Sequence, residues 1–365
     1  MSKLKVIIAG GGTGGHIYPA VAIGHALKRL NEDTELLFVG ALGKMEMEKV
    51  PQEGFEIVGL DIAGFNRSNM LKNLLLPIKI IKSYMKARSI LKSFQPDAVV
   101  GVGGYASFPM LNAAQGKGIP TLIQEQNSYA GKSNKILSKK ADAICVAYDG
   151  MERFFPKSKI IKTGNPVREK ITASTVSRAE GIKKFELKED KKTILVVGGS
   201  LGAKAINEAI DRGVEGLLSD DVQIIWQTGK FYYEQAKQRV TNSSERVKVF
   251  EFIKDMDLAY AAADVVVSRA GALAISELCI VAKPVVFVPF PFAAEDHQTS
   301  NAMSLVEKGA ALMVKNDKAE EELVERVKQL LEDTELQEKM IKNLNALAVK
   351  DADVRIANKV IEITK

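Results

Sequence analysis

Gly10-Gly11-Gly12-Thr13-Gly14-Gly15-His16 is the stretch that decides the fold of this chain. It follows a short apolar run, residues 4–9, which we interpret as a buried strand. It precedes Tyr18-Pro19-Ala20, which we interpret as the start of a helix with a proline near its first turn. Glycines at such a junction let the backbone approach a ligand because no Cβ intervenes, and the helix N-terminus offers unpaired amides and a positive dipole end. The pattern therefore predicts a site for an anionic oxygen.

The same glycines match the dinucleotide fingerprint G-x-G-x-x-G at Gly10, Gly12 and Gly15. A nicotinamide enzyme also needs an acidic residue at the end of the next strand, where it holds the ribose hydroxyls. That strand, residues 35–39, runs into Gly40-Ala41-Leu42-Gly43 and has no carboxylate there. The sequence therefore disfavours an oxidoreductase and keeps the anion-binding loop. A tight turn without a ligand is the structural alternative, although one or two glycines would suffice for it.

Composition sets the broad class. A chain of 365 residues is long for one core, so we expect two domains, and 46% hydrophobic with 26% charged residues is typical of a soluble globular protein. The net charge of +6 suits phosphate-bearing ligands or an anionic membrane surface, whereas the low aromatic content argues against nucleic acid. Cys145 and Cys279 lie in apolar surroundings, which indicates buried thiols in a reducing compartment. With no signal-peptide pattern and no run of membrane-spanning length, we expect a cytoplasmic location.

Short apolar runs alternate with amphipathic segments along the whole chain, which predicts βαβ units and parallel sheets. The expected strands are residues 4–9, 35–39, 56–60, 98–102, 121–124, 143–146 and 159–161 in the first half, and residues 193–197, 223–227, 247–251, 264–268, 284–289 and 311–314 in the second. Each half then has the strands of a doubly wound, Rossmann-like α/β domain. The turn-rich stretch at residues 163–168 marks the joint.

The second half opens like the first. Residues 193–197 run into Gly198-Gly199-Ser200-Leu201-Gly202-Ala203, and the strand at 264–268 leads through Gly271 into a helix that carries Glu277. A carboxylate there could accept hydrogen bonds from both ribose hydroxyls of a nucleotide, or be an ordinary surface glutamate, and the spacing alone favours neither. Ligands of doubly wound folds bind at the carboxyl ends of the strands, so two such domains facing across a cleft would bring these loops together.

Six motifs in order carry a family resemblance. They are Gly-Gly-Gly-Thr-Gly-Gly-His (10–16), Gly-Val-Gly-Gly-Tyr (101–105), Glu-Gln-Asn (125–127), Thr-Gly-Asn-Pro-Val-Arg (163–168), Gly-Gly-Ser-Leu-Gly-Ala (198–203) and Ser-Arg-Ala-Gly-Ala-Leu (268–273). Nearly end to end, the chain resembles the bacterial lipid II-forming glycosyltransferases. These enzymes transfer N-acetylglucosamine from UDP-N-acetylglucosamine to undecaprenyl-diphospho-N-acetylmuramoyl-pentapeptide (lipid I) in peptidoglycan biosynthesis.

The resemblance implies a GT-B fold of two Rossmann-like domains with parallel sheets. Residues 1–165 would form the acceptor- and membrane-binding domain and residues 166–350 the donor-binding domain, with a closing helix at 351–365 packing back on the first. In the donor site, Glu277 would hold the ribose, the backbone of Ile253 the uracil, and Ser200 with Arg168 the diphosphate. The remaining residues implied to contact substrate are Ala272, Leu273, Ala274, Ile275, Ser276 and Gln298 for the diphosphate and sugar, and Thr13, Gly14, Gly15 and Asn127 on the N-terminal side.

Two positions depart from the family pattern. Thr299 follows Gln298 where the family often has a second glutamine, which puts one donor contact in doubt. Gln124 precedes Glu125 where the family often has histidine, which removes a candidate base.

Inverting glycosyl transfer needs an aligned acceptor hydroxyl, a base for its proton and stabilisation of the leaving diphosphate. His16, at the end of the anion loop, is the candidate base, with Glu125 as a second candidate; a structural or phosphate-binding role for His16 is the alternative. We interpret His25 as a packing residue and His297 as a helix cap. Asp220-Asp221 is typical of a solvated turn, and loop amides with Arg168 can balance the diphosphate charge. We therefore expect no metal and no cofactor.

The segment from Ile62 to Pro96 contains seven basic residues and no acidic one. In a helix starting at Pro77, we expect one face to pack on the sheet with Ile80, Tyr84, Ala87, Leu91 and Phe94. Apolar and lysine side chains on the opposite side suit an interface with anionic lipid, although a solvated basic helix is the commoner case. The proposed docking residues are Leu75, Ile78, Lys79, Lys82, Met85 and Lys86.

The expected partners are thus UDP-N-acetylglucosamine, the undecaprenyl-linked acceptor, an anionic membrane surface at its cytoplasmic face, and other cell-wall synthesis proteins. Another UDP-sugar enzyme of the same fold, such as a UDP-N-acetylglucosamine 2-epimerase or a diacylglycerol glycosyltransferase, is the alternative among enzymes. A UDP-binding scaffold without turnover is the alternative outside them.

Overall fold

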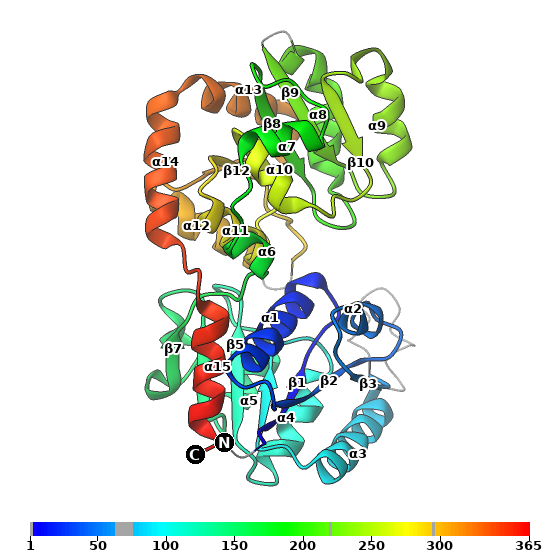
Figure 1. The fold of residues 1–365 in the computed structure, drawn as a ribbon, viewed down its shortest axis with the longest axis vertical. Helices are drawn as coiled ribbons and strands as arrows, with labels where there is room; N and C mark the ends of the chain where they lie inside the picture. The colour runs from blue at the N-terminus through cyan, green and yellow to red at the C-terminus, as the bar shows by residue number, and fades with distance from the viewer. Residues whose placement is uncertain (1–2, 63–75, 219–220, 294–295) are drawn as a thin grey trace. The chain divides into compact units, whose positions relative to one another are not determined.

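The structure is a computed structural model that describes residues 3–62, 76–218, 221–293 and 296–365, apart from the side chains at 76 and 77 (Figure 1). The chain divides into two compact units, Met1–Arg168 with Lys350–Lys365, and Glu169–Val349. The division falls just after the turn-rich stretch at residues 163–168, and the last residues of the chain belong to the first unit.

The first unit is built on a parallel sheet in the order β3-β2-β1-β4-β5-β6-β7. Its strands are β1 (Lys5–Ala9), β2 (Glu35–Ala41), β3 (Ile57–Leu60), β4 (Ala98–Gly101), β5 (Thr121–Glu125), β6 (Ala143–Val146) and β7 (Ile160–Lys162). Runs of Val, Ile, Leu and Ala fill these strands because helices cover both faces of the sheet. The strand order reverses direction between β1 and β4, so the loops after these two strands meet at the switch point of the sheet.

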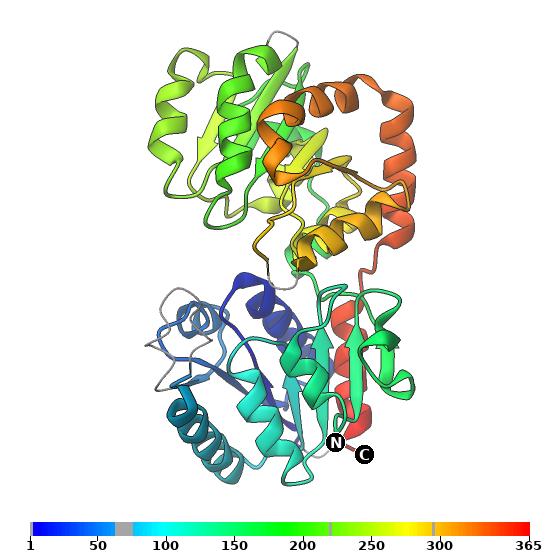
Figure 2. The same ribbon diagram turned by 180° about the vertical axis from the view of Figure 1, so that it is seen from behind.

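Two hydrophobic clusters cover the two faces of this sheet. One contains side chains of α1 (Gly14–Leu30), α2 (Glu46–Gln52) and α15 (Ala352–Ile363), and the other contains side chains of α3 (Leu76–Phe94), α4 (Ser107–Gln115) and α5 (Lys132–Leu137). Figures 1 and 2 show α1 and α15 in front of the strands from one side and α4 and α5 in front from the other.

The second unit repeats the same order of strands, β10-β9-β8-β11-β12-β13, again with parallel pairs throughout. Its strands are β8 (Lys192–Val197), β9 (Val222–Gln227), β10 (Val247–Phe250), β11 (Val265–Ser268), β12 (Val285–Phe287) and β13 (Leu312–Met313). Its helices are α6 (Glu169–Thr172), α7 (Arg178–Lys184), α8 (Lys204–Leu218), α9 (Tyr233–Arg239), α10 (Met256–Ala262), α11 (Ala272–Val281), α12 (His297–Val306), α13 (Ala319–Glu332) and α14 (Thr334–Leu347).

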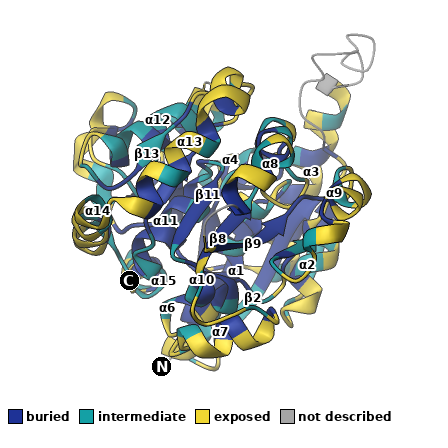
Figure 3. Ribbon diagram, turned by 90° about the horizontal axis from the view of Figure 1, so that it is seen from above, coloured by how far each residue is buried: buried dark blue, intermediate teal, exposed yellow. Residues whose placement is uncertain are grey.

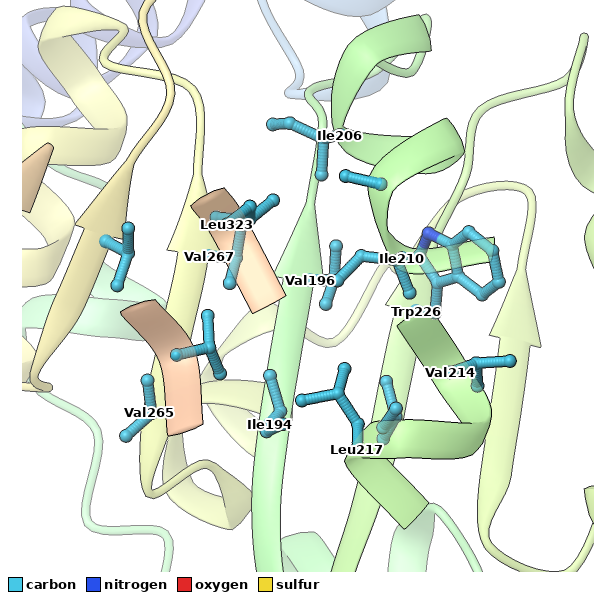
Figure 4. Packing of buried hydrophobic residues seen from close by; sticks show 14 of the residues in the cluster. Ile194, Val196, Ile206, Ile210, Val214, Leu217, Trp226, Val265, Val267 and Leu323 are labelled. Carbon is cyan, nitrogen blue, oxygen red and sulfur yellow. The ribbon is translucent and has the colours of Figure 1, made fainter. Parts of the chain in front are cut away.

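A hydrophobic core joins this second sheet to α8 and α13. Ile206, Ile210 and Val214 of α8 and Leu323 of α13 belong to one cluster with Val196, Trp226 and Val267 of the strands, and Leu323 lies beside Val267 (Figure 4). Figure 3 shows the result by burial, with dark blue strands and yellow outer faces on helices such as α9 and α14. Each unit thus has a core of its own.

All the strands expected from the sequence occur, within a few residues of their expected ends. Two expectations about helices were wrong. α1 begins at Gly14, because the amides of His16 and Ile17 donate to the carbonyl of Thr13, so Pro19 lies inside the helix. Ile80 of α3 is exposed, and Ser83 and Ile90 lie on the buried face with Ala87 and Leu91 instead. Tyr84 and Phe94 pack against that core, as expected.

Candidate active site

In the first unit, the glycine-rich loop leaves β1 at the switch point and ends at the N-terminus of α1. Thr13 occupies the N-cap position, and the amides of Gly14 and Gly15 begin the helix, where backbone donors have no partner within the helix itself. Gly11 and Gly12 have φ angles of 137° and 92°, which a side chain would strain. The loop therefore has the predicted form of a strand, a glycine turn and a helix N-terminus.

A second glycine turn, after β4, packs directly against the first. The amide of Gly11 donates to the carbonyl of Gly103 at 3.2 Å, and a Cβ on Gly104 would lie 2.2 Å from the Gly11 carbonyl oxygen. The ring of His16 lies against Gly103, where an added Cβ would come within 2.8 Å of it. Two motifs that are far apart in the sequence thus form one surface, at the end of the sheet where we predicted a ligand.

The His16 ring is oriented by the loop it follows. Its Nδ1 lies 3.1 Å from the carbonyl oxygen of Gly11 and 3.5 Å from the Thr13 hydroxyl. A carbonyl can only accept, so Nδ1 carries the proton in this contact. In the neutral ring the lone pair is then on Nε2, as a general base requires.

Glu125, the second candidate base, supports a loop. It is buried, and its Oε2 accepts from the Gly131 amide at 3.1 Å and the Asn134 side chain at 2.9 Å. Its Oε1 accepts from the amide and the side chain of Asn127. These contacts fix Asn127 at the carboxyl edge of the sheet and favour a structural role for Glu125 over proton transfer.

Gln124, where the family often has histidine, belongs to a buried amide network. Its side chain donates to Asn165 at 3.0 Å and accepts from Gln126, whose amide also donates to the carbonyl of Val102. The network connects β4 and β5 to the turn at residues 163–168. Close by in sequence, the guanidinium of Arg168 lies 5.1 Å from the centre of the Tyr18 ring, a cation–π contact with α1.

In the second unit, the loop after β8 is a glycine turn closed by a hydrogen bond from Gly202 to Gly199, with Ser200 exposed on it. Gly202 has a φ angle of 82° and faces the backbone after β9, where a Cβ would lie 2.0 Å from the Thr228 oxygen. Only glycine can therefore bring these two strand ends so close.

Glu277 is buried in the second turn of α11 and accepts a 3.0 Å hydrogen bond from the Tyr260 hydroxyl. Of the residues predicted before it, Ala272 and Ile275 are buried, whereas Leu273, Ala274 and Ser276 are half-buried. The Ser276 hydroxyl donates to the Ala272 carbonyl within the helix. Three residues separate α11 from β11, which pairs with β8 in parallel, so the start of α11 and the β8 loop both follow the carboxyl ends of neighbouring strands.

Two further residues predicted to bind the UDP-sugar form hydrogen bonds with other residues of the second unit. The Ile253 amide donates to the Gln227 side chain at 2.8 Å, and Gln227 also donates to the carbonyl of Gly199. Gln227 thus connects the backbone expected to bind uracil to the glycine turn, and no motif in the sequence singles it out. The Gln298 side chain accepts from the amide of Phe290, so it supports the segment after β12.

Thr299, where the family often has a second glutamine, has a hydrogen-bond partner nearby, because its hydroxyl donates to Asp296 at 2.8 Å.

Arg269 places a positive charge next to the turn after β11. Its guanidinium donates to the carbonyls of Val288 and Pro289 and to the side chain of Asn316. Burial lowers the pKa of Arg269 to about 10, so it is still charged at neutral pH. Among the described residues, no group of three or more His, Cys, Asp or Glu side chains is placed to hold a metal ion.

The candidate docking residues lie on α3, except Leu75, which is outside the described residues. Ile78, Ile81 and Met85 are 51%, 60% and 65% exposed, and Lys82 is exposed between them. Lys79 instead donates to Asp61 at 2.8 Å, and Lys86 donates to the carbonyl of Gly59. No described helix of the chain is long and apolar enough to span a bilayer.

Two doubly wound parallel sheets, each with glycine turns at the carboxyl ends of its first strands, are the architecture of the GT-B fold, and two family models define the class as a two-domain glycosyltransferase of this fold. Residues 6–146 match the glycosyltransferase family 28 N-terminal domain and residues 193–356 match its C-terminal domain.

Sequence relatives identify the family within this class of glycosyltransferases. A transferase of Cytophaga hutchinsonii is 55% identical over 98% of this chain and 96% of its own, and one of Bacteroides thetaiotaomicron is 51% identical over 100% and 98%. The crystal structure of Acinetobacter baumannii MurG is similar with a TM-score of 0.80 and 31% identity, covering 98% of this chain and 99% of that one. The chain belongs to the family of UDP-N-acetylglucosamine–N-acetylmuramyl-(pentapeptide) pyrophosphoryl-undecaprenol N-acetylglucosamine transferases.

Proposed function

We propose that this protein transfers N-acetylglucosamine from UDP-N-acetylglucosamine to the undecaprenyl-diphospho-N-acetylmuramoyl-pentapeptide lipid, forming lipid II for peptidoglycan. The observation that carries the proposal is the end-to-end identity of about half the residues with transferases named for this reaction. The ordered glycine turns and the buried Glu277 in the second turn of α11 are compatible with a nucleotide sugar as donor.

The donor site is proposed in the second unit. The carboxylate of Glu277 would hold the ribose, the Ile253 backbone the uracil, and the first amides of α11 with Ser200 the diphosphate. Gln298 would reach the sugar from α12, and Arg168, at the end of the first unit, would add a positive charge for the diphosphate. Backbone amides, a helix dipole and a guanidinium are groups that bind phosphate well.

The acceptor is proposed to bind the first unit, along Thr13, Gly14, Gly15 and Asn127. There, His16 Nε2 would take the proton of the acceptor hydroxyl as the oxygen attacks the anomeric carbon, while the bond from that carbon to the UDP oxygen breaks on the opposite face. A single in-line displacement of this kind inverts the anomeric configuration. Because amides and Arg168 offset the diphosphate charge, we propose that the step requires neither metal nor cofactor.

The direct test combines UDP-N-acetylglucosamine with a short-chain lipid I analogue and follows the products by mass spectrometry. The proposal expects an acceptor heavier by one N-acetylglucosamine unit, and UDP released only when acceptor is present. UDP release or sugar isomerisation without acceptor would indicate an epimerase, and UDP binding without any product would indicate a scaffold.

The proposed independence from metal ions is tested in the same assay. Turnover should persist in excess EDTA at the rate of the untreated enzyme, and added magnesium should restore nothing. A loss of turnover on chelation that magnesium or manganese reverses would show that a metal takes part.

The outer face of α3 is proposed to bind the cytoplasmic face of the membrane, and the lipid acceptor is proposed to be bound from the same face. Its exposed apolar side chains, Ile78, Ile81 and Met85, could enter the headgroup boundary, and Lys82 among them could attract anionic lipid. Other cell-wall synthesis proteins are proposed partners on the same membrane.

A further inference from the structure

The peptide bond between Gly11 and Gly12 is held from both sides by ionisable side chains. On one side, the Gly11 carbonyl lies 3.1 Å from His16 Nδ1. On the other, the Gly12 amide donates to Glu46 Oε2 at 2.7 Å. In a trans peptide the C=O and N–H groups point in opposite directions, so the carboxylate, the peptide and the imidazole form one hydrogen-bonded chain.

Glu46 is well placed to act as a fixed acceptor at the end of this chain. Its side chain is 1% exposed, although it comes from the short surface helix α2. Its other oxygen, Oε1, accepts from the amide of Ala41 at 2.9 Å, at the end of β2. Both oxygens thus accept from backbone donors, which is the bonding pattern of an ionised carboxylate.

Two glycines make room for this carboxylate. A Cβ on Gly11 would lie 2.3 Å from Glu46 Cδ, and a Cβ on Gly40 would lie 2.5 Å from Glu46 Cγ. A glycine at 40 is unexpected within a strand, here as the last but one residue of β2, because it has no side chain to pack. The space for Glu46 accounts for it.

We propose that Glu46 is a positioning residue for His16, acting through the Gly11–Gly12 peptide. The carboxylate fixes the plane of that peptide and, because hydrogen bonds in a chain polarise one another, strengthens the Gly11 carbonyl as an acceptor. The carbonyl then holds the proton of the neutral ring on Nδ1 and directs the lone pair to Nε2. In a Ser-His-Asp triad a carboxylate contacts the histidine directly and holds it in the required tautomer. Here the carboxylate acts on the histidine through one intervening peptide bond.

The kinetic part of this inference rests on the proposed role of His16 as base, whereas the tautomer of His16 can be measured in the free protein. Nitrogen-15 NMR of the histidine rings reports which nitrogen carries the proton, and the spectrum of His16→Gln identifies the His16 signals among the three histidines. We expect the Nδ1–H form in the parent protein.

The test variant is Glu46→Gln, which has a single acceptor oxygen and must turn its NH₂ group toward one of the two backbone amides. We expect a mixture of His16 tautomers and a kcat lowered on the order of 10- to 100-fold, the usual range for removing a group that orients a functional histidine. The KM for UDP-N-acetylglucosamine should not change. Glu48→Gln is the matched control, because Glu48 lies on the same helix with its side chain exposed.

Gly40→Ala gives a second, independent approach. The carboxylate is retained but its Cγ must move away from the new Cβ, so the same loss of the Nδ1–H tautomer and of kcat is expected. Far-ultraviolet circular dichroism and the melting temperature show whether each variant is folded before it is assayed.

The outcomes separate the two proposals. A shift of the His16 tautomer together with a fall in kcat supports the positioning role. A tautomer shift with unchanged kcat supports the positioning chain and argues against His16 as the base. If folded Glu46→Gln and Gly40→Ala proteins keep the parent His16 spectrum, the positioning role is overturned, whatever happens to kcat.

Discussion

At the scale of single residues, Glu277, the proposed ribose contact, is held in one orientation inside the fold. The side chain is only 8% exposed, and the Tyr260 hydroxyl donates to its Oε2 at 3.0 Å. Burial with a fixed partner restricts the carboxylate to one direction, so little conformational entropy is lost when a ribose binds.

Replacing Glu277 by alanine should therefore weaken donor binding specifically. Loss of charge-assisted hydrogen bonds to the ribose costs on the order of 2 kcal/mol, so the KM for UDP-N-acetylglucosamine should rise ~30-fold. Steady-state kinetics with the donor varied measure this change, and a 2′-deoxy donor should be less sensitive to it. Tyr260→Phe, which retains the carboxylate, should give a smaller rise. An unchanged donor KM in Glu277→Ala would remove Glu277 from the ribose site.

The two cysteines were predicted to be buried free thiols, and the structure confirms this. Burial raises the pKa of Cys145 and of Cys279 to about 12, compared with about 8.5 for an exposed thiol. In the folded protein each thiol therefore keeps its proton through pH 9 to 11, where the unfolded chain loses it. The stability that this difference contributes is complete below about pH 8.5 and is lost as the pH rises through about 12.

Because the thiolate is the reactive form, we expect the native protein to react very slowly with a disulfide reagent such as DTNB at pH 8. The chain unfolded in guanidinium should react at both of its cysteines at once. A fast native reaction that consumes both thiols would show that neither is protected by burial.

For single residues, the sequence predicted the position in the fold better than the side chains that each residue contacts. The glycine turns were predictable because clustered glycines are unusual at strand ends, whereas His16 was selected because it ends such a turn and Glu277 because of the family resemblance. Glu46 was missed, since its carboxylate comes from a helix beyond β2 and no local pattern shows that it turns back under Gly11 and Gly40. Tyr260 was missed for the same reason: its contact with Glu277 joins two helices, which only the packed structure brings together.

At the scale of elements, the strands were predictable because buried parallel strands are short, continuous apolar runs. The division of α3 into a buried and an exposed face was less predictable. Ile80 is exposed at 41%, and Ser83 lies on the buried side with a hydrogen bond from its hydroxyl to the Asp61 carbonyl. Because a serine with a backbone partner can be buried, apolar periodicity alone misplaces the buried stripe of such a helix.

The exposed side of α3 leads to a test of membrane binding. Replacing Ile78, Ile81 and Met85 by serine should reduce binding to anionic vesicles even at high salt, because apolar insertion is not screened. Lys82→Glu should reduce binding mainly at low salt, since each lysine near an anionic surface contributes about 1 kcal/mol that salt screens. Sedimentation with vesicles of phosphatidylglycerol and phosphatidylcholine measures both effects.

We choose Lys82 in preference to Lys79 and Lys86 because these two already bind Asp61 and the Gly59 carbonyl. Lys342→Glu, an exposed charge change on α14, is the control and should sediment like the parent. Turnover of a soluble acceptor analogue should be the same in all these proteins. If the serine variant still binds vesicles as the parent does at every salt concentration, the docking face is not on α3.

At the scale of the whole molecule, the chain builds two doubly wound sheets, of seven and six strands, and the sequence predicted two such domains because its strand and helix patterns repeat in each half. What the sequence could not show by itself is how the last helix is held. α15 packs on α1, where Arg29 donates to Asp353, and Ile356, Ala357 and Val360 enter the core that also contains Val6 and Ile8. The end of the chain therefore completes the first unit, although it follows the second.

A chain that ends at residue 350 should accordingly lose stability in the first unit alone. Ile356 and Val360 are both 0% exposed, and burying such a side chain contributes about 1.5–3 kcal/mol, so the melting temperature of the first unit should fall by about 10 °C or more. Differential scanning calorimetry should resolve two transitions, with UDP raising only that of the second unit. Glu362→Ala, which changes a side chain exposed at 66%, should leave both transitions in place. If the truncation lowered the UDP-sensitive transition instead, the assignment of α15 to the first core would be wrong.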